Sequence, residues 1–146
     1  MIIGRSIHSP ICARSLQHEE ISIEQLKSKK IFTFCGIGNP KSFLNTVKSM
    51  GLTVVGSKVY NDHYHYTDRD VTQVWQDAGN CQADLILTTQ KDWTKTALLS
   101  ANKKDIPLAY LAIELKFIAG EDKIIELIEK TIRGKILYAG KHNKRM

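Results

Sequence analysis

From Lys30 onward, short apolar runs alternate with segments of helical periodicity, and this alternation restricts what the chain can fold into. The apolar runs predict strands at Ile31–Cys35, Leu52–Tyr60, Leu85–Leu87 and Leu108–Leu115. Apolar strands separated by helices are typical of a parallel sheet that is covered on both faces. We therefore predict an α/β fold, a three-layer sandwich with a mainly parallel, Rossmann-like sheet of about four strands.

Capping residues mark the helices between these strands. Asn39 precedes Pro40, a pair typical of a helix start, and Gly51 is suited to ending that helix. Thr67 can cap a second helix that ends near Gly79. Two more helices are predicted, a short one ending near Leu99 and one over Glu121–Ile132.

The first 29 residues fit this rhythm less well. Glu24–Lys27 suggests a helical turn, while residues 1–20 suggest a connector or a strand that pairs outside the main sheet. We accordingly divide the chain into a connector or hinge over residues 1–29, an α/β domain over 30–132 and a basic tail over 133–146. A total of 146 residues is enough for one domain with a sizeable core.

Most of the formal net charge of +6 lies in the tail. That tail contains no acidic residue, and its basic residues are Arg133, Lys135, Lys141, Lys144 and Arg145. A basic tail can hold a protein near an anionic membrane surface, or it can simply be solvated. Nucleic-acid binding is disfavoured because the aromatic residues are not interleaved with the basic ones. The three cysteines, Cys12, Cys35 and Cys81, are widely spaced and form no CxxC pair, which favours a reduced, cytoplasmic setting.

Three polar segments follow three of the predicted strands, namely Gly36–Asn39, Asp62–Tyr66 and Thr88–Asp92. In open α/β sheets, ligands bind beyond the carboxyl ends of the strands. We therefore expect these segments to lie along one edge of the sheet, although they are far apart in the sequence.

The Gly36–Pro40 turn has the setting of a dinucleotide fingerprint, but Lys41 occupies the place of the third glycine. The turn can attract an anion at the helix N-terminus, or it can be purely structural. A P-loop is absent from the sequence, because Ser57-Lys58 reverses the required order of lysine and hydroxyl residue.

The segment from Asp62 to Asp70 holds three carboxylates and two imidazoles, of His63 and His65. These groups suit proton transfer, and the two histidines with Asp62 or Asp70 could instead bind a divalent metal. A solvated loop that caps the next helix is the alternative. Lys91-Asp92 likewise suits contact with phosphate or a local ion pair.

In combination, these motifs resemble the C-terminal part of the tetraacyldisaccharide 4′-kinase family, the lipid A 4′-kinases. The shared motifs are Gly36-Ile37-Gly38-Asn39-Pro40 with Phe43, Asp62-His63-Tyr64-His65-Tyr66, and Thr88-Thr89-Gln90-Lys91-Asp92. Tyr64 and Gln90 depart from the family pattern, which has histidine and glutamate there. The P-loop half that precedes this region in the family is missing from the sequence.

The resemblance implies a kinase that transfers the γ-phosphate of ATP, with Mg²⁺, to the 4′-hydroxyl of lipid A disaccharide 1-phosphate. This step of lipid A biosynthesis takes place at the cytoplasmic face of the inner membrane of Gram-negative bacteria. His63 would be catalytic and would assist an aspartate of the missing P-loop domain, while Asp62 would orient His63. The substrate or phosphate-binding residues would be Gly36, Gly38, Asn39, Lys91 and Asp92, and no metal site is implied.

With half of the site absent, we expect this chain alone to be inactive and not to bind ATP or Mg²⁺ tightly. It would then be a fragment or a truncated gene product. Two alternatives are a stand-alone, non-catalytic binding module of the same fold and a small metal-dependent phosphoesterase. The phosphoesterase would use Asp62, His63, His65 and Asp70.

Overall fold

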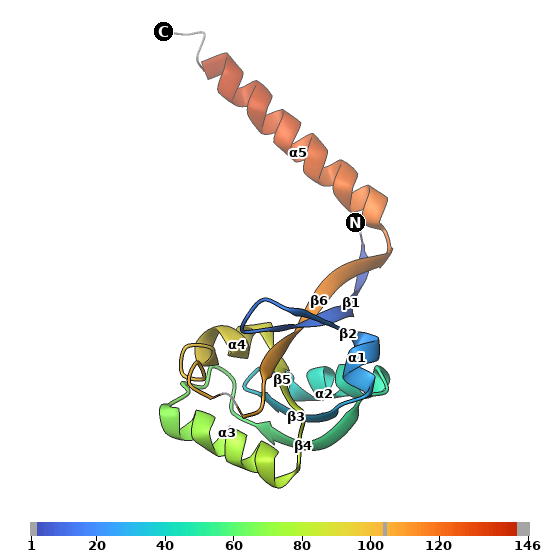
Figure 1. The fold of residues 1–146 in the computed structure, drawn as a ribbon. Coiled ribbons are helices and arrows are strands. Elements are labelled where there is room, and N and C mark those ends of the chain that lie inside the picture. The colour runs from blue at the N-terminus through green and yellow to red at the C-terminus, as the bar shows by residue number, and fades with distance from the viewer. Residues whose placement is uncertain (1–2, 104, 143–146) are drawn as a thin grey trace. The chain divides into compact units, whose positions relative to one another are not determined.

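The computed structural model describes residues 3–103 and 105–142, with side chains as far as residue 135. Its strands join in one mixed sheet of order β2-β1-β6-β5-β3-β4 (Figure 1). The strands are β1 (Arg5–Ser15), β2 (Glu20–Ser22), β3 (Lys30–Cys35), β4 (Thr53–Val59), β5 (Leu85–Thr89) and β6 (Leu108–Ala119). The helices are α1 (Ile23–Lys27), α2 (Pro40–Ser49), α3 (Asp68–Asn80), α4 (Gln90–Thr96) and α5 (Glu121–His142).

The parallel part of the sheet confirms the predicted α/β class. Strand β3 pairs in parallel with β4 and with β5, and β5 pairs in parallel with β6. The carboxyl ends of β3, β4 and β5 therefore lie at the same edge. The prediction of about four strands was too low, because the described residues form a six-stranded sheet in which β1 and β2 pair antiparallel.

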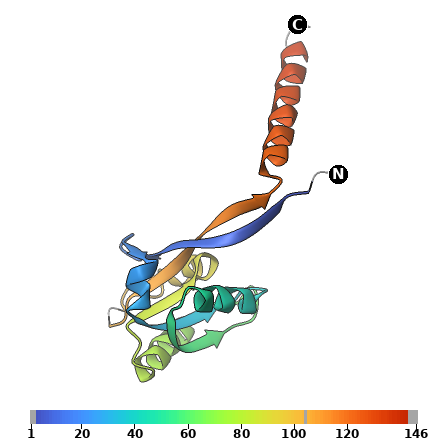
Figure 2. The same cartoon turned by 90° about the vertical axis from the view of Figure 1, so that its right-hand side faces the viewer.

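Alternating side chains of the strands face two separate cores. Ile31 and Cys35 pack with Leu26 of α1 and with Phe43 and Val47 of α2 in one cluster. On the other face, Phe32, Phe34 and Ile86 pack with Val71, Val74 and Trp75 of α3, and with Trp93 of α4. Figures 1 and 2 show these helices against the sheet. Helices thus cover both faces of the sheet. This is required because successive side chains of a strand point to opposite faces, and in these strands both sets are apolar.

The predicted helix caps are confirmed. The Asn39 side chain accepts a hydrogen bond from the Ser42 N–H, and Pro40 occupies the first turn of α2. Thr67 forms a capping box with Asp70 at the start of α3. Such caps satisfy N–H groups that have no partner within the helix.

Three elements extend beyond their predicted bounds. Residues 1–20, expected to be a connector or an outlying strand, contain β1, which belongs to the main sheet. Strand β6 continues to Ala119 and helix α5 to His142, past the predicted ends at Leu115 and Ile132. Residues 133–142 of the predicted basic tail are therefore helical. The side chains of Lys141, Lys144 and Arg145 lie outside the described part of the chain.

The chain divides into two compact units. One comprises Pro10–Ile113, and the other comprises Met1–Ser9 together with Glu114–Met146. All three polar segments of the sheet edge belong to the first unit. In that unit, Trp75 of α3 is largely buried and donates its indole N–H to the Ile106 carbonyl, 3.0 Å away. Among the described residues, no helix has both the length and the apolar character needed to cross a membrane.

We expect Leu87→Ala to lower the free energy of unfolding by about 2–5 kcal/mol, because it leaves a cavity in the middle of the sheet. Leu87 is fully buried, whereas Leu98 is 88% exposed and provides the matched control. Leu98→Ala should change the free energy of unfolding by less than about 0.5 kcal/mol. Urea denaturation of both variants checks this, and equal effects would contradict the packing described.

Candidate functional site

The three polar segments predicted to share one edge of the sheet do lie together. Lys91, in the first turn of α4, hydrogen-bonds through Nζ to Asp62 Oδ1 of the β4–α3 loop at 3.4 Å. The Gly36 N–H at the end of β3 donates to Asp92 Oδ2 at 3.1 Å. Parallel pairing of β3 with β4 and β5 brings the three strand ends, and hence these loops, to one place.

Asp62 contacts both His63 and Lys91. Its Oδ2 is 3.5 Å from His63 Nε2, and its Oδ1 contacts Lys91. Partial desolvation would raise the pKa of Asp62, but the hydrogen bond from Lys91 and the charge of His63 outweigh it and hold that pKa below its ordinary value. Asp62 is therefore a carboxylate at neutral pH, suited to orienting an imidazole.

His63 occupies the exposed tip of the loop in a strained conformation. Its side chain is 79% exposed, and its backbone φ is +57°, in the left-handed region. For a residue with a Cβ this region costs about 1–2 kcal/mol. Strain of this kind gathers at functional sites, because it persists only where the surrounding structure enforces it.

Two glycines allow the acidic side chains to approach the β3–α2 turn. A Cβ at position 38 would lie 3.1 Å from Asp62 Oδ2. A Cβ at position 36 would lie 2.8 Å from the Tyr66 hydroxyl and 3.3 Å from Asp92 Oδ1. The turn thus needs glycine at position 36 for packing against the other two segments, whether or not it also binds an anion, whereas a Cβ at position 38 would require the half-exposed Asp62 side chain to shift slightly.

Asp92 is fully buried, and Gly36 is the other candidate residue that is buried. Its carboxylate accepts hydrogen bonds from Gly36 N–H, from Thr89 Oγ1 at 2.6 Å and from the Tyr66 hydroxyl at 2.9 Å. The prediction of direct contact with substrate or phosphate does not fit this position, since protein donors already occupy the carboxylate. Burial first, and then the charge of Asp92, raise the pKa of the nearby Cys35 thiol to about 11.

Three tyrosines pack beneath the loop. The ring centroids of Tyr60 and Tyr64 are 4.6 Å apart, and Tyr66 meets both rings edge-on at 5.1 and 5.2 Å. The Tyr64 hydroxyl donates to Asp70 Oδ1 at 3.1 Å. Desolvation, followed by the charge of Asp70, raises the pKa of Tyr60 to about 12. The cluster gives an otherwise polar loop an apolar underside.

The four residues of the metal alternative are not arranged as a cation site. Asp70 accepts hydrogen bonds from Thr67 N–H and Oγ1 through Oδ2, and from Tyr64 through Oδ1. The Asp70 carboxylate is thus occupied by the hydrogen bonds that cap the start of α3. Over residues 3–103 and 105–142, no group of three or more His, Cys, Asp or Glu side chains is placed to hold a metal.

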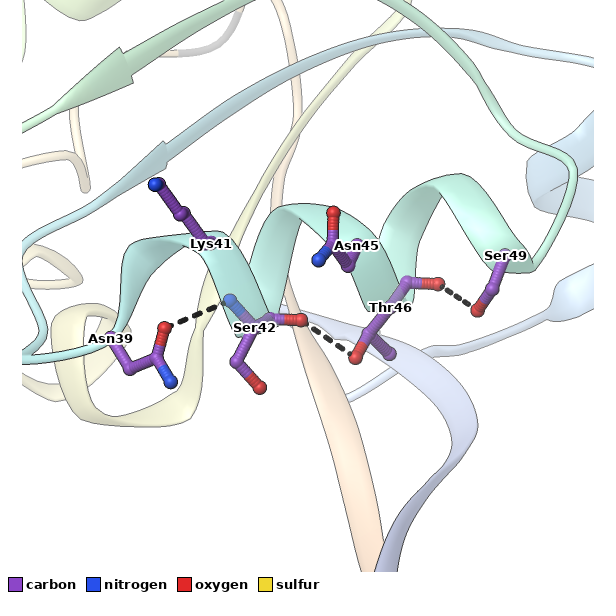
Figure 3. Close-up of a pocket in the computed structure, with 6 residues that line it drawn as sticks. All are labelled: Asn39, Lys41, Ser42, Asn45, Thr46 and Ser49. Atoms are coloured by element: carbon purple, nitrogen blue, oxygen red, sulfur yellow. Dashed lines mark hydrogen bonds between the residues drawn. The ribbon is translucent and has the colours of Figure 1, made fainter.

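Asn39 lies at one end of a shallow, polar depression of about 550 Å³ along α2 (Figure 3). Its Oδ1 accepts from Ser42 N–H, while Thr46 and Ser49 hydrogen-bond to carbonyls within the same helix. The Asn39 amide nitrogen is the part of this side chain that remains able to donate to a ligand.

Sequence reasoning missed two residues of the site, Tyr66 and Thr89. Thr89 caps α4 by accepting from the Asp92 N–H at 3.1 Å, and its own hydroxyl donates to the Asp92 carboxylate. The spacing Thr89-x-x-Asp92 is that of a capping box and could have shown this. Nothing local in the sequence indicates the bond from Tyr66 to Asp92.

We expect His63→Gly to be more stable than His63→Ala by about 1 kcal/mol, because glycine adopts a positive φ without the Cβ clash. Both substitutions remove the imidazole, so their difference isolates the backbone. His65 has no positive φ and is the control. There, the glycine variant should be the less stable of the two. Thermal unfolding of the four variants decides, and the same order at both positions would refute the strain at His63.

Asp70 should make stability depend on pH. Hydrogen bonds from the Thr67 backbone and then from its side chain lower the pKa of Asp70 below 3.8. When folding lowers the pKa of a carboxyl group, the ionised group stabilises the protein at any pH above its unfolded-state pKa. This stabilisation is lost as the pH falls through the folded-state pKa. The difference in stability between the wild type and Asp70→Asn should therefore shrink from pH 6 toward pH 2. In a Thr67→Ala background that pH dependence should be weaker, and an unchanged dependence would contradict the assignment.

The chain matches the family LpxK, Tetraacyldisaccharide-1-P 4′-kinase, over residues 4–133. It is 33% identical over 115 residues to the tetraacyldisaccharide 4′-kinase of Syntrophus aciditrophicus, a match that covers 78% of this chain and 30% of that protein. It is 45% identical over 69 residues to the enzyme of Rickettsia bellii, covering 47% of this chain and 21% of the relative.

A solved structure shares the fold. It is the "apo" form of LpxK from Aquifex aeolicus in complex with ATP, with a TM-score of 0.54 and 22% identity. The match covers 87% of this chain and 35% of the other. The chain thus spans about a third or less of the length of these relatives. By its match over residues 4–133, this protein belongs to the tetraacyldisaccharide 4′-kinase family.

Proposed function

We propose that this chain is the C-terminal portion of a tetraacyldisaccharide 4′-kinase and forms one wall of its active site. The complete enzyme transfers the ATP γ-phosphate to the 4′-hydroxyl of lipid A disaccharide 1-phosphate, at the cytoplasmic face of the inner membrane. The observation that carries the proposal is the joining of Asp62, His63 and Lys91 at the carboxyl edge of the sheet, in a chain that belongs to this family.

His63 is the catalytic residue that this wall contributes. The 4′-oxygen forms a bond to the γ-phosphorus while the bond from that phosphorus to the β,γ-bridging oxygen breaks and ADP leaves. The hydroxyl proton passes to a base on the P-loop portion, which His63 assists and Asp62 helps to orient. The 3.5 Å contact between Asp62 Oδ2 and His63 Nε2 supports this pairing. General acid–base assistance accelerates such a step by roughly 10²–10⁴-fold.

Lys91 and the β3–α2 turn form the anion-facing part of the site. The Lys91 side chain is 47% exposed, and its Nζ has Asp62 as a partner at 3.4 Å, so a phosphate oxygen can approach it from solvent. Gly38 lies beside Asp62, and the Asn39 amide nitrogen can donate a hydrogen bond. Positioning and charge stabilisation of this kind contribute most of the catalysis in phosphoryl transfer.

Over the described residues, no group of three or more His, Cys, Asp or Glu side chains is placed to hold Mg²⁺, and the sequence has no P-loop for the nucleotide phosphates. Lys58, the lysine closest to a P-loop pattern, lies in β4, where it pairs with Asp77 at 3.3 Å and lies over the Tyr60 ring. We therefore assign ATP and Mg²⁺ to a P-loop portion that is the partner of this chain.

The second unit offers a surface for such a partner. Ile118 of β6 and Ile125, Ile128 and Ile132 of α5 are each at least 46% exposed. Residues 125, 128 and 132 recur at helical spacing and so share one side of α5. Exposed apolar side chains gathered on one side of a helix are typical of surfaces that contact another protein segment or a membrane.

We expect activity only when this chain is combined with the separately expressed P-loop portion of a related kinase. The assay is transfer of labelled γ-phosphate from ATP to tetraacyldisaccharide 1-phosphate. His63→Ala should lower the rate by roughly 10²–10⁴-fold, because it removes the acid–base assistance. His65→Ala is the control and should leave the rate within about twofold of wild type.

Phosphorylation by the purified chain alone would contradict the division of the site between two portions. An inactive mixture whose two portions bind each other would instead favour a non-catalytic module of the same fold.

A further inference from the structure

We propose that Asp92 is a positioning residue of this site, which holds the loop of Asp62 and His63 in place through the hydroxyl of Tyr66. The inference rests on the proposed function, because it concerns how the same site is held in a productive geometry. It gives a role to a candidate side chain whose burial keeps it from the substrate.

The two oxygens of Asp92 face different parts of the chain. Oδ2 accepts from Gly36 N–H at 3.1 Å and from Thr89 Oγ1 at 2.6 Å. Oδ1 accepts from the Tyr66 hydroxyl at 2.9 Å. A helix cap needs only the exchange between Asp92 and Thr89. The bond to Gly36 ties α4 to the β3–α2 turn, and the bond to Tyr66 ties it to the segment Asp62–Tyr66, here called the histidine loop. A cap alone requires neither bond.

Tyr66 is fixed as a rigid link. Its ring meets Phe34 edge-on at 5.8 Å, in addition to the contacts with Tyr60 and Tyr64. Burial, then the charge of Asp92, raise the pKa of the Tyr66 hydroxyl, so that it remains a hydrogen-bond donor. Aromatic packing thus fixes the orientation of the Tyr66 ring, and the hydrogen bond to Asp92 holds its hydroxyl in place.

The histidine loop is consequently anchored at both ends. At its start, the Tyr60 N–H donates to the Cys35 carbonyl at 2.8 Å. At its end, Tyr66 is held by Asp92. His63 lies between these anchors at a φ of +57°, a conformation that needs outside support. Loss of the second anchor should let the loop relax and move the imidazole.

Position 36 is adapted to this arrangement. A Cβ there would be 2.8 Å from the Tyr66 hydroxyl oxygen, which is closer than a Cβ atom comes to a non-bonded heavy atom in proteins. Gly36 also donates its N–H to the same carboxylate. One glycine therefore makes room for the Tyr66–Asp92 bond and takes part in the network that includes it.

The test compares two hydroxyl deletions in the same aromatic cluster, made in the 146-residue chain. Tyr66→Phe removes the donor to Asp92 and keeps the ring. Tyr60→Phe is the matched control, because the Tyr60 hydroxyl is buried without a hydrogen-bond partner in the described residues. Backbone ¹⁵N relaxation then reports the order of residues 62–65. We expect order parameters of about 0.85 in wild type and Tyr60→Phe, and below about 0.6 in Tyr66→Phe.

A kinetic measurement separates positioning from folding. In the enzyme reconstituted with the P-loop portion, Tyr66→Phe should lower kcat on the order of tenfold, because a displaced catalytic group loses its alignment. KM for both substrates should stay within about twofold, and Tyr60→Phe should match wild type in both constants.

Equal loop order in the two variants would overturn the inference, and so would a disordered loop with unchanged kcat. If the reconstituted wild type is inactive, the proposed function fails. The relaxation comparison still decides whether Asp92 holds the loop through Tyr66.

Discussion

The buried carboxylate of Asp92 is the interaction on which the functional edge of this protein depends. A buried charge is costly unless polar groups surround it. Here a backbone N–H and two hydroxyls supply hydrogen bonds, and they come from three different strand-to-helix connections. Charge-assisted bonds of this kind are shorter and stronger than neutral ones. The requirement to satisfy one carboxylate thus draws distant parts of the chain into a single structure.

The central fold was predictable because its signals are local. Apolar runs marked β3, β4 and β5, and the caps Asn39 and Thr67 marked α2 and α3. Strand β1 was harder, since Ile7 is the only aliphatic residue of its first half, which ends in Pro10, a residue that cannot donate to a ladder. Strand β2 has only three residues and pairs with Cys12–Arg14, a contact that no local pattern encodes.

The site was predictable in outline and not in detail. Parallel strand topology was sufficient to infer that the loops after β3, β4 and β5 meet. The direction of each side chain was not available in this way. Lys91 and Asp92 are adjacent in the sequence, yet one contacts Asp62 at the surface and the other is fully buried. Residues at the start of a helix point in different directions, so neighbours in a motif can have unlike roles.

The position of the two tryptophans has an optical consequence. Trp75 and Trp93 are the only tryptophans of the chain, and both lie in the unit Pro10–Ile113. Intrinsic fluorescence therefore follows that unit, which carries the functional edge. Far-UV circular dichroism also includes the long helix α5 in the other unit. The two signals will trace the same denaturation curve only if both units unfold in one cooperative transition. Tryptophan emission is thus a selective reporter of the part of the protein that holds His63.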